Sequence, residues 1–178
     1  KIIGAEQLKN TAESLGINNE ITMELGSSKS SFLMTKDCTE SELVETAIGQ
    51  GKTGATPLYM ATLISAIAND GVMMQPYIVD RYIKYTGKEY GQNIPEKIST
   101  IMTEEEAKKL QGLLVDAVTL GTGSAAAING WETGGKTGTA ENPKGTDHSW
   151  FVGFSPAEDP KIAVAVVLEN PKSNAKAA

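Results

Sequence analysis

The sequence predicts an α+β fold in which helices pack on an antiparallel sheet. Helical patterns, with apolar residues three and four positions apart, dominate residues 4–120, whereas strand patterns dominate the end of the chain. Three strand candidates lie there, at 133–141, 149–154 and 161–168. A polar loop and a tight turn connect them, and connections this short join antiparallel neighbours. Helices followed by a three-stranded meander are typical of the α+β class.

The composition is that of a soluble globular domain. The chain has 178 residues, of which 40% are hydrophobic and 21% are charged, enough for one domain with a core. A net charge of −6 disfavours nucleic acid or an anionic membrane as the main partner. The longest apolar run, 162–168, is far too short to span a bilayer. With one cysteine and one histidine, the chain has no internal disulfide and no structural zinc site.

Four helices are predicted. The first covers residues 4–15 and ends at Gly16, and a short second helix covers 40–48. The third begins at Thr56 as N-cap, with Pro57 at the first helical position, and its apolar residues cover most of the circumference. The fourth begins at Thr103 with the spacing of a capping box and ends at 121–123. Its predicted inner face consists of Leu110, Leu113, Leu114, Ala117 and Val118.

Two further strands are predicted between the third and fourth helices. Residues 72–74 and 77–85 are rich in β-branched and aromatic side chains and lie on either side of Pro76. A turn at 86–88 follows them.

The segment 130–141 carries the strongest functional motif. Its residues 130–137 match the nucleotide-binding P-loop pattern, G-x-x-x-x-G-K-T. A P-loop requires an apolar strand before the glycines and a helix that begins at the lysine, because the N–H groups of that helix bind the phosphates. Residues 124–129 are weak strand formers, and Gly138, Pro143 and Gly145 leave no space for a helix. The sequence therefore disfavours nucleotide binding.

The second interpretation of this segment is a Lys-Thr-Gly motif on an edge strand that lines a cleft. In such a strand a lysine ammonium and a threonine hydroxyl bind a substrate carboxylate, and a backbone N–H beyond the glycine polarises the scissile carbonyl. The glycine permits a ligand to approach the strand closely. The three-stranded meander that begins at 133 fits this interpretation.

The residues around the motif resemble class B penicillin-binding proteins, the cell-wall transpeptidases. Residues 136–141 look like the family's Lys-Thr-Gly-Thr version, and five other segments agree in order and spacing. These are 47–51, 56–61, 66–71, 121–123 and 148–154, so the resemblance covers roughly residues 1–170. It implies a transpeptidase-like or β-lactamase-like fold, of which this chain holds the late helices and the last three strands.

The resemblance also implies roles for four residues. Lys136 binds the carboxylate of the substrate or antibiotic and belongs to the proton-relay network, and Thr137 donates a hydrogen bond to that carboxylate. Gly138 leaves room for the acyl group, and the backbone N–H of Thr139 forms half of the oxyanion hole. The partners it implies are a peptidoglycan stem peptide ending in D-Ala-D-Ala and β-lactam antibiotics, with no metal or organic cofactor.

The family's nucleophile motifs are not found at their expected place. Ser-x-Asn is absent, and Ser-x-x-Lys occurs once, at 173–176, downstream of the last strand. The chain also opens without Met. We therefore expect residues 1–178 to be the C-terminal part of a transpeptidase domain, inactive without the remainder of that domain. The resemblance implies a parent protein outside the cytoplasmic membrane, tethered by an N-terminal anchor.

Other interpretations remain open from the residues alone. A serine β-lactamase or a D,D-carboxypeptidase shares the motif, and a non-catalytic interaction module is an alternative of another class. Residues 147–149 contain the letters of a catalytic triad, but adjacent strand residues point to opposite faces. We therefore expect His148 to be structural or to lie at the rim of the cleft.

Overall fold

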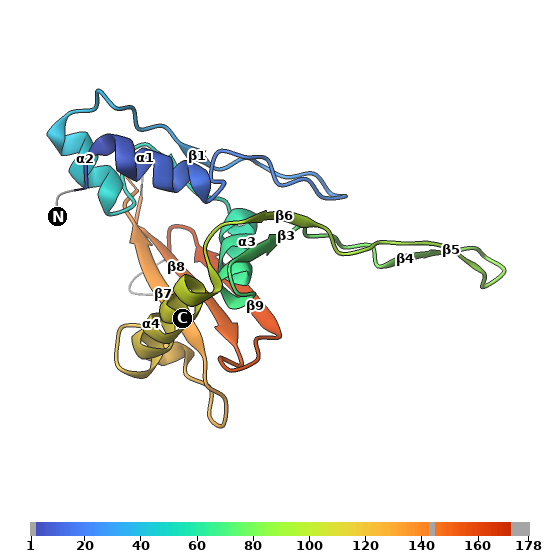
Figure 1. The fold of residues 1–178 in the computed structure, drawn as a ribbon. Coiled ribbons are helices and arrows are strands. Elements are labelled where there is room, and N and C mark those ends of the chain that lie inside the picture. The colour runs from blue at the N-terminus through green and yellow to red at the C-terminus, as the bar shows by residue number, and fades with distance from the viewer. Residues whose placement is uncertain (1–2, 143–144, 172–178) are drawn as a thin grey trace.

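The computed structural model describes residues 3–142 and 145–171, and it contains helices and antiparallel strands as predicted (Figure 1). The helices are α1 (Ala5–Ser14), α2 (Glu40–Ala47), α3 (Pro57–Ala68), α4 (Glu104–Thr119) and the 3-10 helix η1 (Ser124–Ala126). The short strands are β1 (Ser31–Phe32), β2 (Thr53–Gly54), β3 (Val72–Met74), β4 (Arg81–Ile83), β5 (Glu89–Gln92) and β6 (Lys97–Thr100). The longer strands are β7 (Gly134–Ala140), β8 (His148–Ser155) and β9 (Ile162–Leu168).

Threonine side chains cap three of the helices. Thr56 accepts a hydrogen bond from the Tyr59 backbone N–H and begins α3, with Pro57 directly after it. Thr103 and Glu106 form the predicted capping box of α4. Thr39 and Glu42 form a second capping box at the start of α2. Each cap satisfies backbone N–H groups that have no partner within the helix, which fixes where the helix begins.

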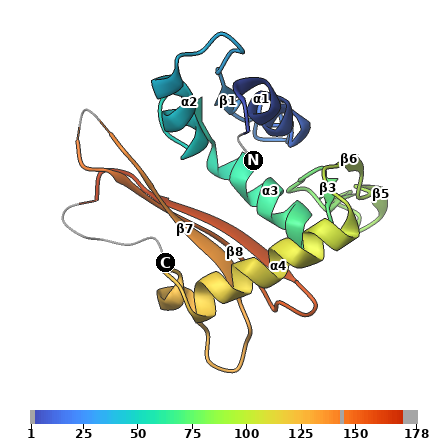
Figure 2. The same ribbon diagram turned by 60° about the vertical axis from the view of Figure 1, so that its left-hand side comes forward.

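The predicted meander is confirmed as a three-stranded antiparallel sheet in the order β7-β8-β9. Lys136 lies opposite Val152 of β8, and Val152 lies opposite Ala165 of β9. Helices α3 and α4 both lie on one side of this sheet (Figure 2). The other side of β9 carries the side chains of Ile162, Val164 and Val166, which remain 38–64% exposed.

Helix α3 contributes to two hydrophobic clusters. Near its beginning, Tyr59 packs in a cluster with Ile17, Ile21, Phe32 and Met34. Near its end, Ile64 and Ile67 pack with Leu114 of α4 and Phe154 of β8. The prediction that α3 is buried on most of its circumference is confirmed, because it connects the N-terminal cluster to the sheet.

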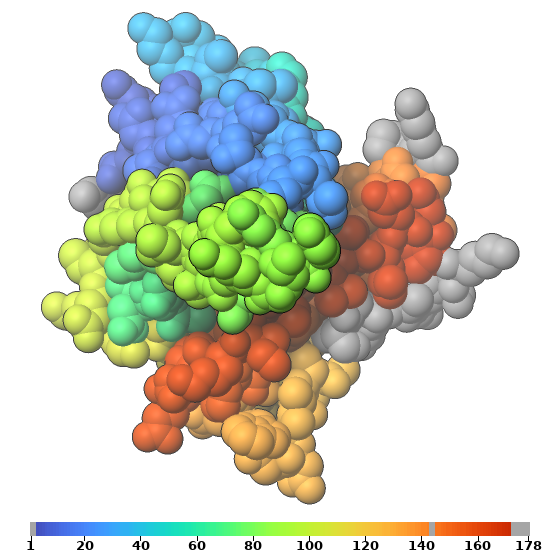
Figure 3. All heavy atoms as spheres, turned by 90° about the vertical axis from the view of Figure 1, so that its right-hand side faces the viewer, coloured from blue at the N-terminus to red at the C-terminus, as the bar shows by residue number. Residues whose placement is uncertain are grey.

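The region between α3 and α4 differs from the prediction. The prediction of a strand over 77–85 is wrong for most of its length, because only Arg81–Ile83 form β4. This strand pairs with β5 in a hairpin that projects from the body in Figure 1 and points toward the viewer in Figure 3. At the base of this hairpin, the Glu24 carboxylate accepts hydrogen bonds from the backbone N–H groups of Ile78 and Val79, each at 3.1 Å. A side chain thus satisfies backbone groups that a neighbouring strand would otherwise bind. The prediction of a strand over 72–74 is confirmed.

The inner face of α4 also differs from the prediction at one position. Leu113 is 64% exposed, whereas Gln111 is buried and donates a hydrogen bond from Nε2 to the Ile67 carbonyl at 2.7 Å. The buried residues of α4 are Ala107, Gln111, Leu114 and Val118, spaced by four, three and four positions. A single helical face contains that series, and Leu113 lies outside it because each residue advances by about 100°.

The stability of the fold should respond to pH through the carboxyl group of Glu42. Hydrogen bonds from the Lys52 ammonium, at 2.8 Å, and from Thr39 lower the pKa of this group from 4.5 to about 2. In that range the unfolded chain binds a proton that the folded protein does not, so the stabilisation is complete above pH 4.5 and is lost as the pH falls to about 2.

We therefore expect the free energy of unfolding to fall less steeply over this window in Glu42→Gln than in the wild type. Urea unfolding at stepped pH measures the slope, and Glu40→Gln in the same helical turn is the control. Equal slopes in the wild type and Glu42→Gln would contradict the assignment.

Candidate active-site strand

The predicted site residues Lys136, Thr137, Gly138 and Thr139 are consecutive residues of β7. In the part of the chain that the structure describes, β7 pairs with β8 alone, so its other edge is a free edge. Side chains alternate along a strand, and a Cβ added at Gly134 would meet the ring of Phe154, which packs against α3 and α4. Lys136 and Gly138 therefore lie on the same side of the sheet as these helices.

The backbone of Thr137 and Thr139 faces this free edge. The Thr139 carbonyl accepts a hydrogen bond from Gln50 Nε2 at 3.0 Å, and the Thr137 carbonyl accepts one from Lys136 Nζ at 2.7 Å. In an extended strand the N–H and C=O of one residue point to the same edge. The N–H of Thr139 thus points away from β8, where an added ligand can accept its hydrogen bond.

The glycines of β7 have two different structural contexts. A Cβ at Gly135 would lie 2.4 Å from Phe151 Cζ and 2.8 Å from the Val152 carbonyl oxygen, so packing against β8 requires glycine there. At Gly138 the nearest contact of a Cβ would be Trp150 Cβ at 3.4 Å. Packing within the protein therefore accounts for a glycine at position 135 but does not require one at position 138. The missing side chain at Gly138 leaves space beside the strand.

The structure adds two residues that sequence reasoning did not assign to the site. Thr122, which follows α4, places its Oγ1 2.8 Å from Oγ1 of Thr137. Gln50, which follows α2, contacts the other end of the motif at Thr139. Both lie in segments noted for their family resemblance, 47–51 and 121–123. The sequence motifs do not indicate these contacts, because the residues of one pair are 15 positions apart and those of the other pair are 89 positions apart.

The charge of Lys136 is available to an anionic ligand. None of the ion pairs among residues 3–142 and 145–171 includes Lys136, and its side chain is exposed. Its ammonium lies at the free edge, where its contact is the Thr137 carbonyl. A carboxylate bound there would accept charge-assisted hydrogen bonds, which are stronger than those between neutral groups.

The structure excludes the alternative P-loop interpretation of this segment. A P-loop lysine begins a helix, whereas Lys136 lies within the strand Gly134–Ala140. The single Ser-x-x-Lys match, 173–176, lies outside the described residues. In the described part of the chain, no group of three or more His, Cys, Asp or Glu side chains is placed to hold a metal ion.

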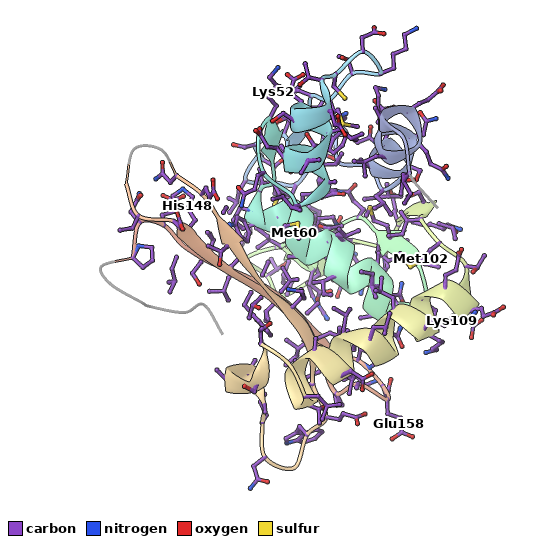
Figure 4. All side chains as sticks on the ribbon, turned by 90° about the vertical axis from the view of Figure 1, so that its left-hand side faces the viewer. Lys52, Met60, Met102, Lys109, His148 and Glu158 are labelled. Carbon is purple, nitrogen blue, oxygen red and sulfur yellow. The ribbon has the colours of Figure 1, made fainter. Side chains whose placement is uncertain are left out.

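His148 begins β8 at one end of the sheet (Figure 4). It lies opposite Ala140, and its Nδ1 accepts a hydrogen bond from the backbone N–H of Asn170 at 3.2 Å. This contact joins the ends of β8 and β9 and is consistent with the structural role predicted for His148. Cys38 and Lys52 line a separate small cavity beside α2.

Comparison with known proteins identifies the class to which this fold and strand belong. The family model described as the penicillin-binding protein transpeptidase domain matches residues 1–178. The chain belongs to the penicillin-binding protein transpeptidase family, as its sequence predicts.

The relatives extend this assignment. The peptidoglycan D,D-transpeptidase PbpA of Mycolicibacterium smegmatis is 32% identical over 94% of the chain, and the stage V sporulation protein D of Bacillus subtilis is 36% identical over 74%. The chain spans 34% and 21% of the lengths of these two relatives.

Solved structures share the fold. The D,D-transpeptidase domain of a peptidoglycan glycosyltransferase from Eggerthella lenta is 39% identical, with a TM-score of 0.87, and the match covers 95% of this chain and 44% of that one. The imipenem acyl-enzyme complex of penicillin-binding protein A from M. tuberculosis is 30% identical, with a TM-score of 0.88, over 97% of this chain and 39% of that one. The α+β prediction of a transpeptidase-like fold is thereby confirmed.

Proposed function

We propose that residues 1–178 form the C-terminal part of the transpeptidase domain of a class B penicillin-binding protein. The observation that carries this proposal is the free edge of β7. The ammonium of Lys136, the hydroxyl of Thr137 and the outward N–H of Thr139 lie on this strand, and the hydroxyl of Thr122 contacts that of Thr137. The names of the relatives and the β-lactam complexes among the similar structures support it. The intact protein would crosslink peptidoglycan stem peptides through an acyl-serine.

The proposed reaction has two steps. A serine from the remainder of the domain attacks the carbonyl of the penultimate D-Ala, the peptide bond breaks, and the terminal D-Ala leaves after its nitrogen gains a proton. An amine of a neighbouring stem peptide then attacks the serine ester. The new amide bond forms the crosslink, the bond to the serine oxygen breaks, and the proton that the amine loses goes to that oxygen. β-Lactams acylate the same serine, and their opened ring stays attached.

The residues of β7 would act on both steps. Lys136 and Thr137 would bind the carboxylate of the substrate and hold the peptide along the free edge, and Lys136 would also belong to the proton-relay network. The N–H of Thr139 would donate a hydrogen bond to the oxyanion that develops at the carbonyl. Gly138 would leave space for the acyl group beside the strand.

The exposed side chains of β9 support the proposal that more of the domain packs on this chain. Ile162, Val164 and Val166 form an exposed apolar row on the side of the sheet away from α3. Exposed apolar surfaces of this kind mark interaction sites.

We place the parent protein outside the cytoplasmic membrane, held there by an N-terminal anchor. Among the described residues, no helix has the length and apolar character needed to cross a membrane.

Labelling with a fluorescent penicillin tests the proposal. We expect the complete natural protein that contains this sequence to form a stoichiometric, long-lived adduct, and residues 1–178 alone to form none, because the serine lies outside them. An adduct on residues 1–178 would overturn the assignment of the nucleophile. Rapid hydrolysis of the acyl-enzyme would indicate a β-lactamase instead, and a complete protein that never reacts would indicate a non-catalytic module.

A further inference from the structure

The side chain of Gln50 forms two hydrogen bonds with the free edge of β7. Its Nε2 donates to the Thr139 carbonyl at 3.0 Å, and its Oε1 accepts from the backbone N–H of Glu141 at 3.2 Å. One carboxamide thus binds the outward C=O of one residue and the outward N–H of the residue two positions on. A residue of a parallel strand would bind the same two groups, so the side chain substitutes for a strand at this point.

The backbone around Gln50 is shaped to present this side chain. Gly49 and Gly51 have φ angles of +80° and +70°, in the left-handed region that side chains disfavour. The backbone N–H of Gln50 donates to the Glu45 carbonyl at 2.9 Å, which holds the turn against the end of α2. In contrast to a mobile surface glutamine, Gln50 is half-buried and carried by a turn with a defined conformation.

We infer that Gln50 is a positioning residue for acyl transfer, which sets where the substrate-binding edge of β7 ends and how the Thr139 peptide is oriented. This inference rests on the proposed function. Thr139 has its N–H directed to the reaction centre in that proposal, and Gln50 holds the C=O of the same residue. An extended ligand that pairs along the edge therefore finds the N–H of Glu141 already occupied, and the N–H groups of Thr137 and Thr139 are the outward donors left to it.

The contact also determines which substitutions separate positioning from packing. In Gln50→Glu the side chain keeps its size and can still accept from Glu141 N–H, but an ionised carboxylate cannot donate to the Thr139 carbonyl. In Gln50→Ala both hydrogen bonds are lost. If the side chain only filled space, Gln50→Glu would behave as the wild type and Gln50→Ala would not.

The experiment measures acylation of the complete natural protein by a fluorescent penicillin at several antibiotic concentrations. We expect the acylation rate constant at saturation to fall roughly 10- to 100-fold in both variants, the loss typical of a slightly misplaced reacting group. The dissociation constant of the initial complex should change much less. Hydrogen exchange at the Glu141 amide should accelerate in Gln50→Ala. The control Gln7→Ala removes an exposed glutamine of α1 and should leave all values unchanged.

The outcomes separate this inference from the proposed function. A wild-type protein that fails to react with penicillin overturns the proposed function. If the wild type reacts and Gln50→Glu has the same acylation rate constant, the positioning role is overturned. If Gln50→Ala does not fold, Gln50→Glu alone decides, since it keeps the volume of the side chain.

Discussion

Lys136→Ala in the complete protein is expected to slow acylation by penicillin about 100- to 1,000-fold, the loss typical of removing a group that stabilises the transition state. The ammonium lies at the free edge of β7, 2.7 Å from the Thr137 carbonyl, and the ion pairs of the described residues do not engage it. Its removal takes away a charged donor for the substrate carboxylate. Stopped-flow or gel measurement of the acyl-enzyme gives the second-order rate constant.

Lys161→Ala is the matched control for this prediction. Lys161 is also an exposed lysine next to a strand of the same sheet, but it pairs with Asp159 in the turn between β8 and β9. Acylation of this variant should match that of the wild type. If Lys136→Ala also reacted within a factor of about three of the wild type, carboxylate binding at Lys136 would be refuted.

The second large effect concerns stability. Phe154→Ala is expected to lower the free energy of unfolding by about 3–5 kcal/mol, because it removes a fully buried aromatic ring and leaves a cavity. The Phe154 side chain is 2% exposed and packs between α3 and α4 through Ile64, Ile67 and Leu114. Denaturant unfolding of the complete transpeptidase domain measures the change.

Leu120→Ala provides the comparison, since Leu120 follows α4 and is 82% exposed. Its effect should stay within about 0.5 kcal/mol, as for other surface substitutions. A loss below about 1 kcal/mol in Phe154→Ala would mean that the helices do not depend on this ring for their attachment to the sheet.

Local signals in the sequence predict most of the fold. The caps at Thr56 and Thr103 depend on residues within four positions, and so both helix starts are where the sequence places them. The meander is predictable for the same reason, since short connections leave β7, β8 and β9 one simple arrangement. The four residues of the motif are placed together by a single strand, which is why the sequence can identify them.

Features that depend on distant parts of the chain were not predicted. Ile78 and Val79 have strand-like side chains, but Glu24 binds their backbone N–H groups from more than 50 positions away. Leu113 has an apolar side chain on the wrong face of α4, and the polar Gln111 is buried because the carbonyl of Ile67 accepts its amide proton. The contacts of Gln50 and Thr122 with β7 also join distant parts of the chain, so the periodicity of the sequence does not predict them.

The packing of α3 on the sheet affects how β7, the strand that carries the site, is held in place. From α2 the chain continues through the Gly49–Gly51 turn to α3, which packs on β8 and β9 (Figure 2). Strand β8 pairs with β7, and the side chain of Gln50, in the turn, donates a hydrogen bond to the Thr139 carbonyl of β7. These contacts connect β7 to the helices by two routes, one through β8 and α3 and the other through Gln50 and the turn that follows α2. Thr139 is therefore held by its position opposite Ser149 on one side and by Gln50 on the other, so a shift of the α2 end relative to the sheet would break the hydrogen bonds of Gln50.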